Sequence, residues 1–189
     1  MRTLLLAVAL LTPCALLAQT PASLPNQIQS DLQQSLTGSW TGVLEYRDYS
    51  EPATSTRRVQ LPTWLTITTA NSSQAWHYLY DDGPTKTVEE TDTLSFDPAA
   101  SSYTESDNGK PPHTFKVTGY PELRAGKGQL ILTGPGTDND KPSETRITLT
   151  IRRNLLTILE ETRPAGSSDP FAFRHSFCFT RATPPQPAK

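Results

Sequence analysis

Three histidines, His77, His113 and His175, are the side chains of this sequence best suited to metal or acid–base chemistry. They do not stand at the spacings of known paired metal ligands, such as two histidines four residues apart on one helix. His175 alternates with Phe173 and Phe177, and alternate side chains of a strand point to the same face. We therefore expect the His175 imidazole to face the interior, either as a hydrogen-bonded core histidine or as a ligand-binding group.

Two carboxylates are also candidates for an interior position. Glu90 and Asp92 fall on one strand face together with the apolar residues Val88 and Leu94. Hydrolysis by a general acid and base needs two carboxyl groups held across a cleft, with the pKa of one of them raised. No spacing in the sequence places a second carboxyl group opposite Glu90 and Asp92. We interpret both as charges at a rim or on a solvated face.

Nucleophilic catalysis has no recognisable basis in the sequence. The Gly-x-Ser-x-Gly pattern, which places a serine on a strand-to-helix elbow, is absent. Cys178 is predicted on the face opposite the phenylalanines, with Arg174 on the same face. A neighbouring cation favours the reactive thiolate, but an inert thiol is the simpler interpretation. We predict that the protein is not an enzyme.

The first residues, MRTLLLAVALLTPCALLAQ, have the pattern of a secretory signal, with Arg2 followed by an apolar run from Leu4 to Ala18. We predict a signal peptide over residues 1–18, cleaved near Ala18, and a secreted or periplasmic mature protein. Acylation at Cys14, as in bacterial lipoproteins, is the alternative, but Pro13 occupies the position that needs a small residue.

Charge and cysteine usage exclude several classes of protein. The chain has 17 basic and 19 acidic side chains, and removal of Arg2 changes its net charge from −2 to −3. Nucleic-acid binders usually carry a clustered basic excess, so no nucleic-acid partner is expected. No second long apolar run follows the signal, so no membrane span is expected. Cys178 is the one cysteine of the mature chain and cannot form an internal disulfide. The sequence does not determine an oligomeric state.

Short strands with alternating apolar and polar residues make up most of the mature chain. Gly, Pro, Asn and Asp separate them, which is typical of a β-sandwich or barrel. The predicted strands cover residues 39–50, 57–69, 74–81, 86–96, 101–106, 113–119, 128–133, 144–153, 155–162 and 171–181. Residues 26–36 fit a short helix, with Ile28, Leu32 and Leu36 on one face. We predict an all-β fold, an antiparallel up-and-down barrel of about ten strands with a short N-terminal helix.

The predicted organisation is one domain. After the signal peptide, residues 19–36 form a leader and the short helix, residues 37–182 form the barrel, and residues 183–189 form a disordered Pro-rich tail. Within the barrel, Trp40, Leu44 and Tyr46 share a face. Trp76, Tyr78 and Tyr80 form an aromatic stripe of the same period, which either lines a ligand cavity or packs in the core.

Gly38-Ser39-Trp40 follows the predicted helix and opens the first strand, an arrangement that resembles the Gly-x-Trp signature of lipocalins and other calycin-type barrels. The resemblance implies that Trp40 closes one end of the barrel and that Arg181, on the last strand, packs against it. Ten strands depart from the eight of true lipocalins and are more similar to fatty-acid-binding and nitrobindin-type barrels.

This resemblance implies a protein that binds a small apolar or amphipathic ligand inside the barrel, without a cofactor. The expected ligand-contacting residues are Tyr46, Tyr78, Phe173, His175 and Phe177. A nitrobindin-like barrel with haem on His175 is the first alternative. A barrel filled by its own side chains, serving as a structural or interaction domain, is the second.

Overall fold

The fold is taken from a computed structural model, which describes residues 24–52, 55–107, 111–119 and 127–182. The predicted signal peptide (1–18) and the predicted disordered tail (183–189) lie outside these residues. The one described helix, α1, is too short and too polar to cross a membrane.

The described chain consists of one helix followed by ten strands. Their bounds are α1 Leu24–Leu36, β1 Gly38–Arg47, β2 Arg58–Ala70, β3 Ser73–Asp81, β4 Thr87–Asp97, β5 Ser102–Asp107, β6 His113–Thr118, β7 Lys127–Asp138, β8 Lys141–Arg152, β9 Leu155–Pro164 and β10 Ala172–Arg181. The predicted number and order of elements are confirmed, and most predicted boundaries lie within a few residues of these.

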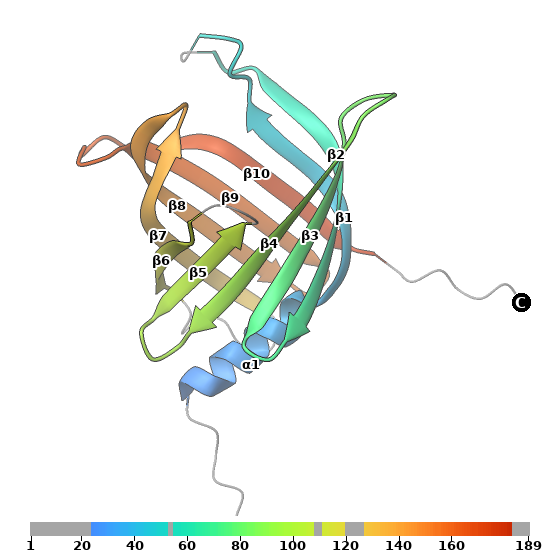
Figure 1. The fold of residues 1–189 in the computed structure, drawn as a ribbon, viewed down its shortest axis with the longest axis vertical. Coiled ribbons are helices and arrows are strands. Elements are labelled where there is room, and N and C mark those ends of the chain that lie inside the picture. Colours follow the sequence, from blue (N-terminus) through green and yellow to red (C-terminus); the bar gives the residue numbers. More distant parts are fainter. Residues whose placement is uncertain (1–23, 53–54, 108–110, 120–126, 183–189) are drawn as a thin grey trace, which may run out of the picture.

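The strands close into an antiparallel up-and-down barrel (Figure 1). Each strand pairs with its neighbours in sequence, and β1 pairs with β10 to complete the ring, with Trp40 opposite Arg181 and Tyr46 opposite His175. Closure leaves no unpaired sheet edge that could template aggregation. The predicted fold class is therefore confirmed.

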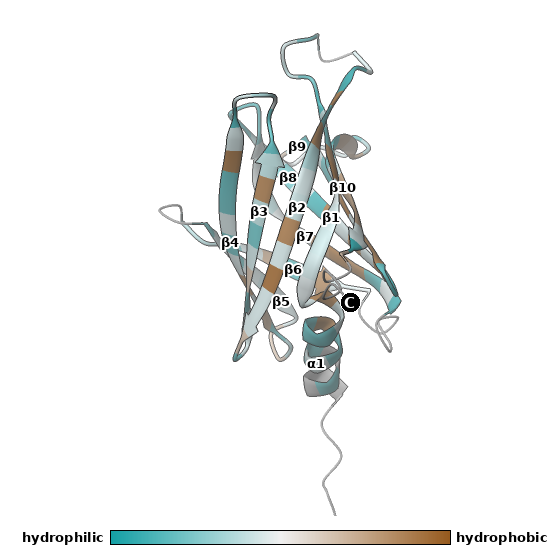
Figure 2. Ribbon diagram, turned by 90° about the vertical axis from the view of Figure 1, so that its right-hand side faces the viewer, coloured by the Kyte–Doolittle hydropathy of each residue, from teal (hydrophilic) through white to brown (hydrophobic). Residues whose placement is uncertain are grey.

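Alternation along each strand decides which side chains fill the barrel. In β3, burial alternates so that Gln74, Trp76, Tyr78 and Tyr80 point inward while His77 is exposed. His77 instead bonds Thr91 on the outer surface, with 2.9 Å between Nδ1 and Oγ1. Figure 2 shows the same alternation as hydrophobic and hydrophilic bands along β2 and β3. The interior therefore has the apolar lining that a closed sheet needs for a core.

Helix α1 lies at one end of the barrel (Figure 1), and Trp40 packs beneath it. Trp40 is 1% exposed, and its Nε1–H donates to the carbonyl oxygen of Leu36 over 2.8 Å. The guanidinium carbon of Arg181 lies 4.2 Å from the Trp40 ring centroid, and its nitrogens donate to the carbonyl oxygens of Ser35 and Thr37. A cation at the last turn of a helix is favourable for its dipole. The predicted pairing of Trp40 with Arg181 is confirmed.

The β7–β8 hairpin differs from the prediction. The residues from Gly134 to Pro142 were expected to form a loop, but β7 continues to Asp138 and β8 begins at Lys141. Asn139 and Asp140 alone make the turn, with φ angles of 50° and 62°. Two left-handed residues form the turn that matches the twist of paired strands. The Gly and Pro residues of this segment are accommodated within the ladder rather than breaking it.

Candidate ligand-binding cavity

The barrel encloses a cavity of about 460 Å³ between its closed end and the opposite mouth. Its size lies within the range of about 300–1,000 Å³ that is usual for small-molecule sites. All ten strands contribute side chains to the lining, and Tyr49 contributes from the segment after β1. The lining residues are Leu44, Tyr46, Tyr49, Leu61, Trp76, Tyr78, Tyr80, Val88, Glu90, Asp92, Leu94, Tyr103, Glu105, Phe115, Leu132, Ile147, Leu149, Ile158, Glu160, Arg174, His175 and Phe177. The barrel interior therefore contains space that its own side chains do not fill.

The mouth lies at the end of the barrel away from Trp40. Tyr49 and Val88 line the cavity and are also exposed to solvent, which marks them as rim residues. The side chains of Leu65, Ile67 and Phe179 are fully buried and do not line the cavity, so they belong to the packed closed end. The cavity therefore extends from the rim near Tyr49 and Val88 to this packed layer.

Four of the five predicted ligand-contacting residues line the cavity: Tyr46, Tyr78, His175 and Phe177. The structure does not place Phe173 there. A register shift in β10 between Phe173 and His175 interrupts the alternation, and the Phe173 ring packs 4.5 Å from the guanidinium carbon of Arg58. This bulge has no signal in the sequence, because the aromatic residues continue at regular spacing across it.

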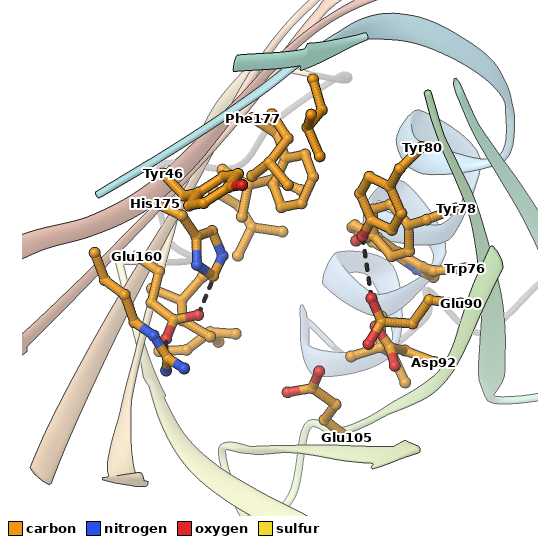
Figure 3. A pocket seen from close by; sticks show the side chains of 18 of the residues that line it. Tyr46, Trp76, Tyr78, Tyr80, Glu90, Asp92, Glu105, Glu160, His175 and Phe177 are labelled. Carbon is orange, nitrogen blue, oxygen red and sulfur yellow. Dashed lines mark hydrogen bonds and ion pairs between the residues drawn. The ribbon is translucent and has the colours of Figure 1, made fainter. Parts of the chain in front are cut away.

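The same bulge turns the Arg174 side chain into the cavity. The alternation of the sequence predicts it instead on the outer face, beside Cys178. Arg174 donates to Glu160 of β9 over 2.7 Å, and His175 Nε2 lies 3.4 Å from the other oxygen of Glu160 (Figure 3). Two consecutive residues therefore contact one carboxylate, which is possible only where the bulge breaks the alternation. Cys178 remains exposed on the outside, as predicted.

The surroundings of His175 lower the pKa of its imidazole from the ordinary 6.5. Burial lowers the pKa of its imidazole, and Arg174 acts in the same direction, while Glu160 opposes the shift. Its ring also packs edge-on against Phe177, with 5.5 Å between the ring centroids. A neutral imidazole beside a carboxylate is oriented by that partner.

Aromatic rings form one continuous part of the cavity wall. Tyr78 and Tyr80 stack with centroids 5.8 Å apart, and Phe177 lies 5.4 Å from Tyr78 and 6.4 Å from Tyr80. Trp76 extends the row along β3. We call Trp76, Tyr78, Tyr80 and Phe177 the aromatic cluster. Its rings present apolar faces to a ligand, and the tyrosine hydroxyls add polar atoms.

Carboxylates form a second part of the wall. Glu90 is exposed, which agrees with the interpretation of a charge at the rim, whereas Asp92 is 9% exposed and does not lie on a solvated face. Both line the cavity, with Glu105 of β5 beside them and Glu160 across from them (Figure 3). We call Glu90, Asp92 and Glu105 the acidic wall. The Tyr80 hydroxyl donates to Glu90 over 3.1 Å, so this wall adjoins the aromatic cluster.

Glu105 is the acidic side chain most affected by this environment. Burial raises the pKa of its carboxyl group, and the negative charge of Glu160 raises it further, with His113 opposing. No hydrogen bond from the described residues reaches the Glu105 carboxylate. Its ionised form is therefore disfavoured in the folded protein relative to the unfolded chain.

Glu105→Gln is expected to stabilise the protein at pH 7. The pKa of Glu105 is raised on folding from its ordinary 4.5, so the native state binds more protons above that pH. Stability contributed by this group is therefore present at low pH and is lost as pH rises through the raised pKa. Urea unfolding followed by circular dichroism should show the variant more stable at pH 7, with the difference shrinking towards pH 4.

Glu89, an exposed residue of the adjacent strand β4, provides the control for this measurement. Glu89→Gln changes the same charge on the outer face of β4, so its effect on stability should be small at every pH. A Glu105→Gln variant that is less stable than the wild type at pH 7 would contradict the assignment of an unfavourable buried charge.

No family model and no curated protein matches the chain. Among solved structures, it is similar to the one titled "Crystal Structure of Rv2717c from M. tuberculosis", with a TM-score of 0.56. The two chains are 14% identical, and the match covers 82% of this chain and 98% of that one. At this identity the likeness shows a common fold. That fold is consistent with the calycin-type barrels that Gly38-Ser39-Trp40 resembles.

Proposed function

We propose that this chain is an exported binding protein that holds a small apolar or amphipathic ligand inside its barrel. The observation that carries the proposal is the cavity of about 460 Å³, lined by the aromatic cluster and reached from one end. An apolar cavity with a few polar groups is the usual form of a small-molecule site. Export is proposed from the apolar run between Leu4 and Ala18.

The chemistry of the lining supports an amphipathic ligand over a purely apolar one. Leu44, Leu61, Ile147, Leu149 and Ile158 supply apolar contacts in the cavity wall. Glu160, Arg174 and His175 supply polar groups on one side, and Glu90 and Glu105 supply them on the other. A ligand with an apolar body and one polar group would satisfy both parts of the wall. The proposal assigns no covalent step to these residues.

Binding of a neutral fluorescent probe tests the proposal. N-phenyl-1-naphthylamine should show saturable, one-to-one fluorescence enhancement with the wild-type protein. Ile147→Trp places an indole ring in the cavity and should weaken probe binding by about tenfold or more, a loss of about 1.4 kcal/mol in binding free energy. Native mass spectrometry and organic extraction of the purified protein would identify a ligand that is carried through purification.

Leu155→Trp is the matched control, since Leu155 is exposed on the adjacent strand β9 and does not line the cavity. It adds the same ring outside the barrel and should leave probe affinity unchanged. Absence of saturable binding, or equal weakening by both variants, would overturn the proposal and favour a structural role.

Haem binding is a second candidate because His175 lies in the cavity, with Glu160 as a carboxylate partner and with the pKa of its imidazole lowered by burial. Histidines that bind a metal usually have such a partner for the other ring nitrogen. Haem would supply redox or gas-binding chemistry, and His175 would hold its iron. The acidic wall would repel the carboxylates of haem, which is why the organic ligand is placed first. A Soret band that survives in His175→Ala, or none in the wild type with added haem, would reject this candidate.

A further inference from the structure

The charges inside the cavity are unbalanced. Four carboxylates line it, from Glu90, Asp92, Glu105 and Glu160, whereas the described lining contains one guanidinium group and no lysine. That guanidinium, from Arg174, is bonded to Glu160. On the other side of the cavity, Glu90 and Glu105 form no ion pair with a basic side chain of the described residues. Negative charge held in a partly apolar space raises the local affinity for cations.

Hydroxyl groups in the same space lack protein partners. Tyr78 is 6% exposed and lines the cavity, yet its hydroxyl forms no hydrogen bond with the described residues. Tyr103 is 3% exposed and also lines the cavity, and its buried hydroxyl has no partner among the described residues. Buried polar groups are normally hydrogen-bonded, so the Tyr103 hydroxyl points to a polar group of a ligand.

The aromatic cluster lies directly beside the carboxylates. Tyr78 is the cross-strand partner of Glu90, and Trp76 is the partner of Asp92. Faces of tyrosine and tryptophan rings attract cations, and ammonium ligands are recognised in this way. Carboxylates adjoining aromatic rings therefore provide both contributions to the binding of an organic cation, charge pairing and ring contact.

Resting on the proposed function, we propose that the barrel selects an amphipathic cation, with a protonated amine or quaternary ammonium group at the acidic wall and an apolar body among the aromatic and aliphatic side chains. The volume of the cavity distinguishes this ligand from a bare metal ion. The ligand atoms of Glu90, Asp92 and Asp107 lie within 4.8 Å of one another, but that cluster would leave the rest of the cavity unused. A divalent cation is therefore the competing occupant in the test.

Three ligands with the same twelve-carbon chain separate charge from apolar contact. Dodecylamine, dodecanol and dodecanoate are each used to displace N-phenyl-1-naphthylamine from the wild-type protein at pH 7. The amine should displace the probe at a concentration about tenfold lower than the anion, since a charge-assisted contact contributes about 1.5–3 kcal/mol and each 1.4 kcal/mol is tenfold. The Glu90→Gln/Glu105→Gln double variant should lose this preference while keeping its affinity for dodecanol.

Glu89→Gln is the control, because Glu89 lies next to Glu90 in the chain but does not line the cavity. It should retain the preference for the amine. Failure of all three ligands and of the probe would overturn the proposed function itself. If dodecanol binds and dodecanoate binds as well as dodecylamine or better, the proposed function stands and the cation proposal is overturned. Displacement of the amine by calcium chloride, lost in the double variant, would identify a metal site instead and also overturn it.

Discussion

Trp40→Ala is expected to lower the free energy of unfolding by about 3–5 kcal/mol, a large part of the 5–15 kcal/mol typical of a domain. Trp40 is fully buried between α1 and the closed end of the barrel. Its loss would leave a void and remove the stacking surface of Arg181 and the hydrogen bond to Leu36. Urea unfolding followed by circular dichroism measures the change without relying on tryptophan fluorescence.

Trp64→Ala is the matched control. Trp64 lies on β2 as the cross-strand neighbour of Thr41, one residue along from Trp40, but it is 45% exposed on the outside of the barrel. Its removal should change the free energy of unfolding by about 0.5 kcal/mol or less, because exposed substitutions away from special features have small effects. Equal losses for the two variants would refute the assignment of Trp40 as the residue that closes the barrel.

Gly42→Ala is expected to cost about 3 kcal/mol or more, although it adds one methyl group. A Cβ at Gly42 would lie 2.0 Å from the carbonyl oxygen of Cys178 and 2.9 Å from the Cα of Phe179. Both are backbone atoms of β10, which pairs with β1 at this point. They cannot rotate away as a side chain would, so the methyl group must separate the two strands that close the barrel.

Thr41→Ala is the control, because Thr41 lies next to Gly42 on β1 and also pairs with β10. Thr41 is exposed and its side chain points away from the interior, so the loss should be about 1 kcal/mol or less, the span of strand propensities. Thermal unfolding of the two variants should give a much lower midpoint for Gly42→Ala. A midpoint equal to that of the wild type would show that β1 and β10 can move apart without loss of stability.

The proposed cation selectivity and these stability effects concern different parts of one barrel. Trp40, Arg181 and α1 make the closed end, where side chains are packed without space for a ligand. The acidic wall and the aromatic cluster line the cavity beyond this packed layer. Substitutions in the acidic wall should therefore alter ligand preference with little loss of stability, and Glu105→Gln is expected to increase stability at pH 7.

The sequence by itself determined the fold class and much of the cavity lining. Alternation with a period of two decides which side of a strand meets the core, because one side must be apolar and the other wet. This placed Tyr46, Tyr78 and Phe177 inside and His77 and Cys178 outside. The resemblance of Gly38-Ser39-Trp40 to the calycin-type signature implied the closed end and its Arg181.

Only the tertiary structure decided where the alternation fails and which polar groups meet. The bulge in β10 removes Phe173 from the cavity and brings in Arg174. The regular spacing of the aromatic residues does not indicate that one extra residue is inserted there. The acidic wall draws on β4 and β5 with Glu160 across from it on β9. Barrel closure and strand register bring these carboxylates together. Contacts between strands far apart in the chain depend on that register, which local spacing does not encode.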